Sequence, residues 1–133
     1  MTIVRIGHVN LRAPRALLES LREFYRDAIG LSDGPRPPFR SFGYWLYAGD
    51  HDVLHLSESA SEELRRTDVA TTFDHVAFAA TGQAEFEARL AAQGIAYSVA
   101  QVPATGQIQL FLRDPAGNGV EMTFAADEPE TPG

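Results

Sequence analysis

Apolar positions follow two different spacings along the chain. They recur at helical spacing over residues 14–29, and Gly30 suits the C-terminal cap of that helix. A second helical pattern covers residues 83–93 and ends at Gly94. Short β-type runs of alternating or continuous apolar residues surround both helices. The pattern therefore predicts an α+β protein with one helix in each half of the chain.

The strand-like runs occur in the same order in both halves. One run precedes each helix, at residues 7–11 and 74–78. The runs that follow the helices are 40–48, 52–57, 96–102, 107–114 and 119–124. Residues 32–38 contain three prolines and a glycine, which favour a loop, so we expect the first strand after the first helix to be short or distorted. The turn formers in residues 114–119 predict a hairpin between the last two strands.

This order indicates an internal duplication into two βαβββ modules, which we expect to form a curved mixed sheet around a cup. We expect a single domain over 1–124, with module one at about 1–57, a linker at 58–70 and module two at 71–124. Residues 125–133 are rich in acid and proline and predict a flexible tail. Four polar residues support the duplication, because 67 positions separate His8 from His75 and 66 separate His55 from Glu121.

Each of these four residues lies in a predicted strand, and its side chain points to the face opposite to that of its apolar neighbours in the chain. Strand side chains alternate between two faces, so Leu54 and Leu56 point away from the side chain of His55. The apolar faces should pack under the helices and leave the other face lined by the four polar groups. A single strand histidine is usually only a hydrogen-bonded residue, but four donors at equivalent positions predict a metal site. Its predicted ligands are His8, His55, His75 and Glu121.

The same reasoning predicts the walls of the cup. By equivalence between the halves, Phe42 and Tyr44 should correspond to Gln109 and Phe111. We expect five side chains to bind substrate, with the last near the rim: Phe42, Tyr44, Gln109, Phe111 and Arg113. Ordinary packing explains Phe42 and Phe111 equally well. Trp45 and Tyr47 have the other parity, so we expect Trp45 to pack under a helix.

Composition limits the partners. The chain has 133 residues, a net charge of -7 and a pI of about 4.9, which disfavours nucleic acid. It has no cysteine, which excludes thiolate sites and disulfides and fits a reducing compartment, so we expect a cytoplasmic protein. No apolar run approaches membrane-spanning length. The expected partner is a small-molecule substrate, with neither nucleic acid nor membrane involved.

Four segments resemble the vicinal oxygen chelate superfamily, which includes glyoxalase I, extradiol dioxygenases and fosfomycin and bleomycin resistance proteins. They are residues 6–9, 24–31, 73–78 and 111–121, and the resemblance covers nearly all of residues 3–124. The Asp-Pro-x-Gly-Asn-x-x-Glu-like ending at 114–121 is the most specific. The resemblance implies metal ligands at His8, His55, His75 and Glu121, and a homodimer, which would also cover exposed sheet edges.

One position departs from glyoxalase I, which commonly has glutamate where this chain has His55. Extradiol dioxygenases instead resemble the chain in using two histidines and a glutamate, at places matching His8, His75 and Glu121. His55 is therefore either a fourth ligand or an acid or base beside the metal. Glu121 and His55 are the predicted catalytic residues. The donor set suits one divalent ion (Fe²⁺, Mn²⁺, Ni²⁺, Co²⁺ or Zn²⁺).

Three functions remain open from the sequence. The first is a metal-dependent enzyme that binds a substrate through adjacent oxygens, with extradiol-type ring cleavage slightly favoured. The second is a glyoxalase I-like lyase, an epimerase or an antibiotic-modifying enzyme on the same site. The third is a non-catalytic drug-binding resistance protein, against which the four intact ligand positions argue.

Overall fold

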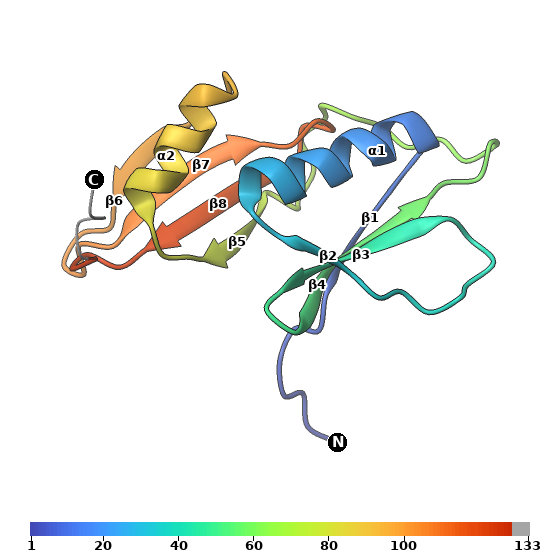
Figure 1. Cartoon of the computed structure of the whole chain (residues 1–133), viewed down its shortest axis with the longest axis horizontal. Coiled ribbons are helices and arrows are strands. Elements are labelled where there is room, and N and C mark those ends of the chain that lie inside the picture. The colour runs from blue at the N-terminus through green and yellow to red at the C-terminus, as the bar shows by residue number, and fades with distance from the viewer. Residues whose placement is uncertain (129–133) are drawn as a thin grey trace. The chain divides into compact units, whose positions relative to one another are not determined.

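The computed structural model describes residues 1–128, and the chain forms two compact units, Met1–Arg66 and Thr67–Gly133. Each unit has one four-stranded mixed sheet and one α-helix (Figure 1). Both units run in the order strand, helix, strand, strand, strand. The predicted α+β fold of two βαβββ modules is therefore confirmed.

The first unit has the sheet order β1-β4-β3-β2. Its elements are β1 (Val9–Ala13), α1 (Arg15–Glu23), a π-helical segment (Phe24–Ile29), β2 (Ser32–Gly34), β3 (Gly43–Ala48) and β4 (His51–Glu58). β1 pairs with β4 in parallel, and the other pairs are antiparallel. The predicted short strand after the first helix is β2, which has three residues.

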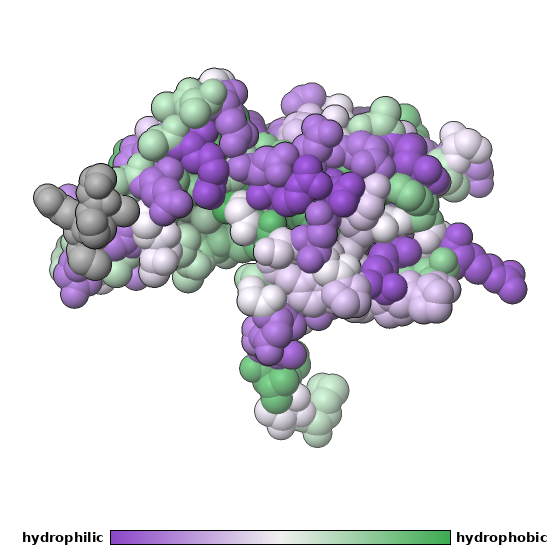
Figure 2. Space-filling model, in the orientation of Figure 1, coloured by the Kyte–Doolittle hydropathy of each residue, from purple (hydrophilic) through white to green (hydrophobic). Residues whose placement is uncertain are grey.

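The apolar positions of the first helical pattern form the core of this unit. Leu18, Leu21 and Tyr25 are buried, and Leu54 and Leu56 of β4 are buried on the sheet that α1 contacts. Gly30 ends the helical region in the left-handed conformation, with φ of 102°, as its position predicted. The expected continuous helix instead changes to π geometry at Phe24. Hydrophilic side chains lie over α1 on the face seen in Figure 2.

The second unit repeats this arrangement with the order β5-β8-β7-β6. Its elements are β5 (His75–Ala79), α2 (Gln83–Ala92), β6 (Ser98–Gln101), β7 (Ile108–Arg113) and β8 (Gly119–Phe124). β5 and β8 are parallel. The apolar residues of α2, β7 and β8 form the buried core: Phe86, Leu90, Leu110, Leu112, Val120, Met122 and Phe124. The alternation that the sequence predicted therefore determines which face of each strand is buried.

The turn between β7 and β8 is stabilised by one buried carboxylate. Asp114 is 5% exposed, and its Oδ1 accepts hydrogen bonds from the backbone N–H groups of Ala116 and Asn118, both at 2.9 Å. Its Oδ2 accepts a third from Asn118 Nδ2. Gly117 adopts a positive φ of 88° in the turn. The predicted hairpin is thus confirmed, with Arg113 paired to Gly119.

The connection between the modules has turns, bends and irregular backbone over residues 59–74, without a helix. Of the expected flexible tail at 125–133, residues 129–133 lie outside the described part of the chain. None of the helices among residues 1–128 has the length and apolar character needed to cross a membrane.

Candidate metal centre

The first unit brings His8 and His55 into direct contact. The parallel register pairs Asn10 of β1 with His55 of β4, so His8 lies two residues earlier on the chain and on the same face. The two imidazole rings stack with centroids 3.7 Å apart and an interplanar angle of 12°. The prediction that these two histidines share a face of the sheet is confirmed.

The second unit repeats this register with a carboxylate. Ala77 of β5 pairs with Glu121 of β8, and His75 lies two residues before Ala77. The Nε2 atom of His75 lies 3.8 Å from Oε1 of Glu121. In each unit, therefore, a histidine lies beside a potential metal ligand of the parallel neighbouring strand; His8 immediately precedes β1 and His75 is the first residue of β5.

Glu121 is an unusually buried carboxylate for a strand position, with 7% of its surface exposed. Gln109 Nε2 donates a hydrogen bond of 3.0 Å to its Oε1, and the Thr123 hydroxyl donates one of 3.1 Å to its Oε2. A carboxylate can accept about four hydrogen bonds, so two neutral donors leave it able to bind a cation or a proton.

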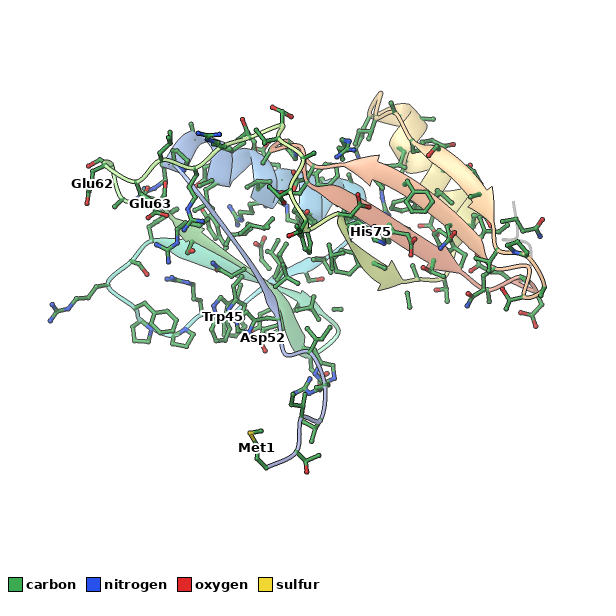
Figure 3. All side chains as sticks on the ribbon, turned by 180° about the vertical axis from the view of Figure 1, so that it is seen from behind. Met1, Trp45, Asp52, Glu62, Glu63 and His75 are labelled. Carbon is green, nitrogen blue, oxygen red and sulfur yellow. The ribbon has the colours of Figure 1, made fainter. Side chains whose placement is uncertain are left out.

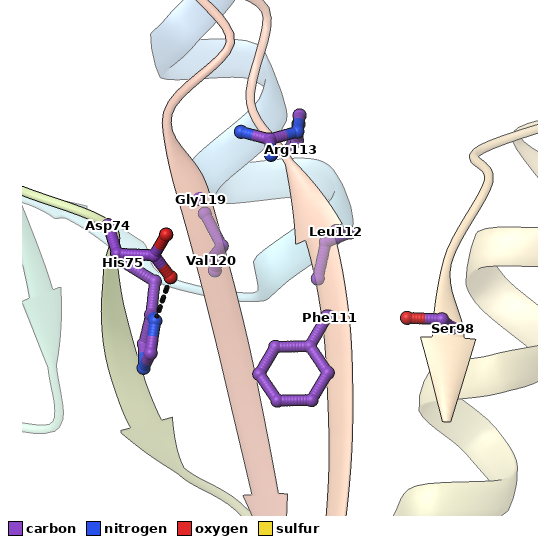
Figure 4. A pocket seen from close by; sticks show the side chains of 8 residues that line it. All are labelled: Asp74, His75, Ser98, Phe111, Leu112, Arg113, Gly119 and Val120. Carbon is purple, nitrogen blue, oxygen red and sulfur yellow. Dashed lines mark hydrogen bonds and ion pairs between the residues drawn. The ribbon is translucent and has the colours of Figure 1, made fainter. Parts of the chain in front are cut away.

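A pocket of about 230 Å³ adjoins His75 in the second unit (Figure 4). Phe111 pairs across the strands with Glu121, and its ring is edge-on to His75 at 6.0 Å between centroids. Arg113, two residues along β7, also lines the pocket and donates to the Gly117 carbonyl at 3.0 Å. Gln109, Phe111 and Arg113 thus lie on the predicted face, and their binding of substrate stays a prediction.

Phe42 and Tyr44 lie elsewhere. The Tyr44 hydroxyl donates a 2.6 Å hydrogen bond to Glu19 of α1, and the Phe42 ring lies 3.4 Å under the guanidinium of Arg15. Desolvation and the neighbouring Glu19 carboxylate raise the pKa of Tyr44. The expectation that Phe42 and Tyr44 face the histidines was wrong, because both contact the helix.

Phe42 and Tyr44 lie on the other face because the repeat shifts by one residue between the two modules. The offset between modules is 67 at the opening histidines but 66 in the later strands, where Trp45 pairs with His55 as Phe111 pairs with Glu121. Trp45, expected under a helix, instead stacks on His55 with centroids 4.1 Å apart and an angle of 9°. Trp45 is therefore the equivalent of Phe111.

Sequence reasoning also missed Asp52. Its Oδ2 lies 2.7 Å from Nε2 of His55, and Asp52, His55 and His8 offer donor atoms that all lie within 4.8 Å of one another. Strict alternation puts residues three apart on opposite faces. The β3–β4 register shifts between Leu46 and Ala48, however, and this bulge allows Asp52 to reach His55. The hydrogen bond with His55 lowers the pKa of Asp52.

A pocket of about 660 Å³ surrounds this cluster in the first unit. Trp45 and Asp52, both labelled in Figure 3, line it together with the two histidines. Phe39 and Arg36 lie in the connection between β2 and β3 and form another part of the wall. The pocket thus combines imidazole and carboxylate donors with aromatic surface and a guanidinium group, which suits a small polar ligand.

These donors fit a divalent metal ion. Imidazole and carboxylate ligands lie about 2.0–2.2 Å from such an ion, so two of them are typically about 3–4 Å apart. The 3.8 Å separation of His75 and Glu121 agrees with that spacing. The first unit also offers two imidazole nitrogens and a carboxylate oxygen that all lie within 4.8 Å of one another. This borderline set of nitrogen and oxygen donors suits first-row transition metals and zinc.

No protein-family model matches the chain, and no curated protein matches its sequence. Solved structures do match. One described as a glyoxalase family protein from Bacillus anthracis is 26% identical, with a TM-score of 0.71 over 94% of this chain and 98% of the other. A lactoylglutathione lyase from Agrobacterium tumefaciens is 26% identical, with a TM-score of 0.64 over 93% and 96%.

A fosfomycin resistance protein from Listeria monocytogenes has the same fold at 15% identity, with a TM-score of 0.67 over 93% of this chain and 95% of the other. The chain therefore has the fold of the vicinal oxygen chelate superfamily, and the resemblance noted in its sequence is confirmed. Proteins of this fold include enzymes, and this chain carries a histidine and aspartate group able to hold a metal.

Proposed function

We propose that this protein is a divalent-metal enzyme whose small substrate binds through adjacent oxygens. Its proposed metal ligands are His8, His55, His75 and Glu121, and its proposed cofactor is one divalent ion. The observation that carries the proposal is the repeated register: each unit places a histidine from the start of its first strand, or from the residue just before it, beside a potential ligand on the parallel strand. Such an equivalence has no purpose in packing, because the apolar sides of the same strands already form the cores.

The bound metal would supply Lewis-acid stabilisation of negative charge on the substrate oxygens. The chain's own residues would do the rest. Glu121 is the proposed base, since Gln109 and Thr123 orient its two oxygens and leave lone pairs unused. His55, held between two rings, is the second proposed proton carrier. Phe111 and Trp45 would exclude water from the substrate, and Arg113 would bind a polar group near the second-unit pocket.

Non-oxidative lyase or isomerase chemistry is our first choice. It is supported by the 26% identity to a lactoylglutathione lyase over 93% of this chain. Ring-cleaving dioxygenase chemistry is the second candidate, supported by the two-histidine, one-carboxylate set His8, His75 and Glu121. The donor set argues against a binding protein without catalysis.

The exposed sheet edges favour a homodimer. β1 and β5 are each at the edge of their sheet, with one hydrogen-bonded neighbour among the described strands. Unpaired strand edges are usually covered in native proteins, so we include dimerisation in the proposal, together with a cytoplasmic location.

The test loads metal-free protein separately with Ni²⁺, Zn²⁺, Mn²⁺, Co²⁺ and, without oxygen, Fe²⁺. Each form is assayed with methylglyoxal plus glutathione, with fosfomycin plus thiol or water, and with a catechol panel in an oxygen-electrode cell. Turnover without oxygen uptake supports the first choice, and oxygen uptake with a yellow ring-fission product supports the second. A protein that binds none of the five metals above buffer level refutes the proposal, whatever the substrate.

The matched variants are Glu121→Gln and, at an exposed position of α2, Glu85→Gln. The first keeps the shape of residue 121 and one of its two acceptor oxygens but removes its charge and basicity, so we expect a loss of activity of about 10²-fold or more. The second makes the same change at a carboxylate outside the proposed site and should leave turnover unchanged.

A further inference from the structure

His55 has an environment unlike that of a surface histidine. Its side chain is 13% exposed, and its ring is sandwiched between Trp45 at 4.1 Å and His8 at 3.7 Å, with both neighbours within 12° of parallel. This sandwich fixes the plane of the imidazole. It leaves open which ring nitrogen points toward which neighbour, because a ring flip within that plane keeps both stacking contacts.

Asp52 distinguishes between the two ring nitrogens. Its Oδ2 is 2.7 Å from Nε2 of His55, a distance typical of a charge-assisted hydrogen bond. An ionised carboxylate has no proton to donate, so in the neutral imidazole the proton must be on Nε2. The other nitrogen, Nδ1, then carries the lone pair.

The bulge in β4 makes this contact possible. The β3–β4 pairing shifts by one residue between Leu46 and Ala48, at the level of Asp52. Bulges commonly redirect a side chain beside a functional site. Here the redirected side chain contacts one of the proposed ligands.

His75 has a related contact through its other nitrogen. Nδ1 of His75 lies 2.7 Å from Oδ2 of Asp74 (Figure 4). Its Nε2 lies 3.8 Å from Oε1 of Glu121. Asp74 is far more exposed than Asp52, at 89% against 39% of the side chain, so water competes more strongly for it. We therefore expect the contact from Asp52 to fix the orientation of its histidine more strongly than the contact from Asp74 does.

We propose that Asp52 is a positioning residue that holds His55 through Nε2 and presents Nδ1 as the metal-binding or proton-carrying atom. This inference rests on the proposed function for the role of His55, although the hydrogen bond itself does not. Metal-bound histidines usually donate their second N–H to a carboxylate or carbonyl, which fixes their orientation and raises their basicity. Asp52 would perform this task from three residues away on the same strand.

The first experiment uses metal-free, ¹⁵N-labelled protein at pH 8. Long-range ¹H–¹⁵N spectra report which nitrogen of His55 carries the proton and whether that proton exchanges slowly enough to be observed. We expect a protected Nε2-bound proton in the natural protein. It should be lost in Asp52→Ala and retained in Asp52→Asn, whose amide oxygen can still accept it.

The second experiment titrates Co²⁺ into the same proteins and follows its visible absorption. Loss of a partner of this kind typically weakens metal binding about 10–100-fold, so we expect this loss in Asp52→Ala and a smaller one in Asp52→Asn. The spectrum at saturation should be unchanged, because the ligands are the same. Asp50→Ala is the matched control beside exposed His51, and it should change neither readout.

Three results would overturn the inference. They are a proton on Nδ1 of His55 in the natural protein, Co²⁺ affinity unchanged in Asp52→Ala, or a saturated spectrum altered in that variant, which would make Asp52 a direct ligand. If no protein binds Co²⁺, the proposed function fails while the proton readout still tests the hydrogen bond. The unfolding midpoint of Asp52→Ala separates these results from a loss of folding.

Discussion

Replacing Gln109 by leucine tests whether the buried Glu121 depends on its neutral hydrogen-bond donors. The substitution keeps a side chain of similar size but removes the Nε2 donor 3.0 Å from Oε1. Glu121 is 7% exposed, so water has little access to replace the lost donor. Thr123 would remain as a donor, at 3.1 Å from the other oxygen.

A hydrogen bond to a charged group contributes about 1.5–3 kcal/mol to stability, and one such bond is lost here. We therefore expect the free energy of unfolding of metal-free Gln109→Leu to fall by about 1.5–3 kcal/mol at pH 7. For a protein of this size, the melting temperature should fall by roughly 5–10 °C.

Urea unfolding of the metal-free proteins at pH 7, followed by circular dichroism, measures this loss. Gln107→Leu is the matched control, because Gln107 is exposed and immediately precedes β7. It should change stability by about 0.5 kcal/mol or less. Equal stability of the two variants would refute the view that Gln109 supports a buried, charged Glu121.

Two further predictions concern the scaffold. Gly117→Ala should destabilise the protein by more than about 1 kcal/mol, because residue 117 has a φ of 88° and an added Cβ would lie 2.5 Å from Oδ1 of Asp68. A thermal unfolding curve unchanged from that of the natural protein would contradict this prediction. The hydrogen bond from Arg22 lowers the pKa of Asp33, so their interaction stabilises the protein above the unfolded carboxyl pKa of about 4 and is lost as the pH falls through the lower folded value. Asp33→Asn should therefore reduce the loss of stability measured between pH 5 and pH 2. If the stability of the variant and of the natural protein falls equally over this range, the Arg22–Asp33 pair contributes nothing to stability.

The sequence was sufficient for the fold because the same hydrophobic pattern occurs twice. Alternation in β8 identified Val120 and Met122 as core residues and Glu121 as a residue of the opposite face. The helix positions followed equally from spacing and from the cap at Gly30. Local patterns of this kind are visible in the sequence because each residue's face depends on its immediate neighbours.

The parts that failed depend on irregularities that a repeat does not reveal. Tyr44 was assigned to the wrong face because the offset between equivalent residues of the two modules is one residue shorter in the later strands. Trp45 therefore occupies the position beside His55 that was expected for Tyr44. Asp52 was missed because the bulge in β4 breaks strict alternation. Both errors arise from a shift of one residue, which moves a strand side chain to the opposite face.

Metal stoichiometry and affinity in one variant from each unit test the central claim most directly. Elemental analysis and competitive titration would be applied to the natural protein, His8→Ala and Glu121→Gln, all purified without an affinity tag. We predict one ion per chain in the natural protein, and a large loss of affinity from either substitution, because both residues are proposed metal ligands. Two ions per chain, or a variant that keeps full affinity, would contradict the account.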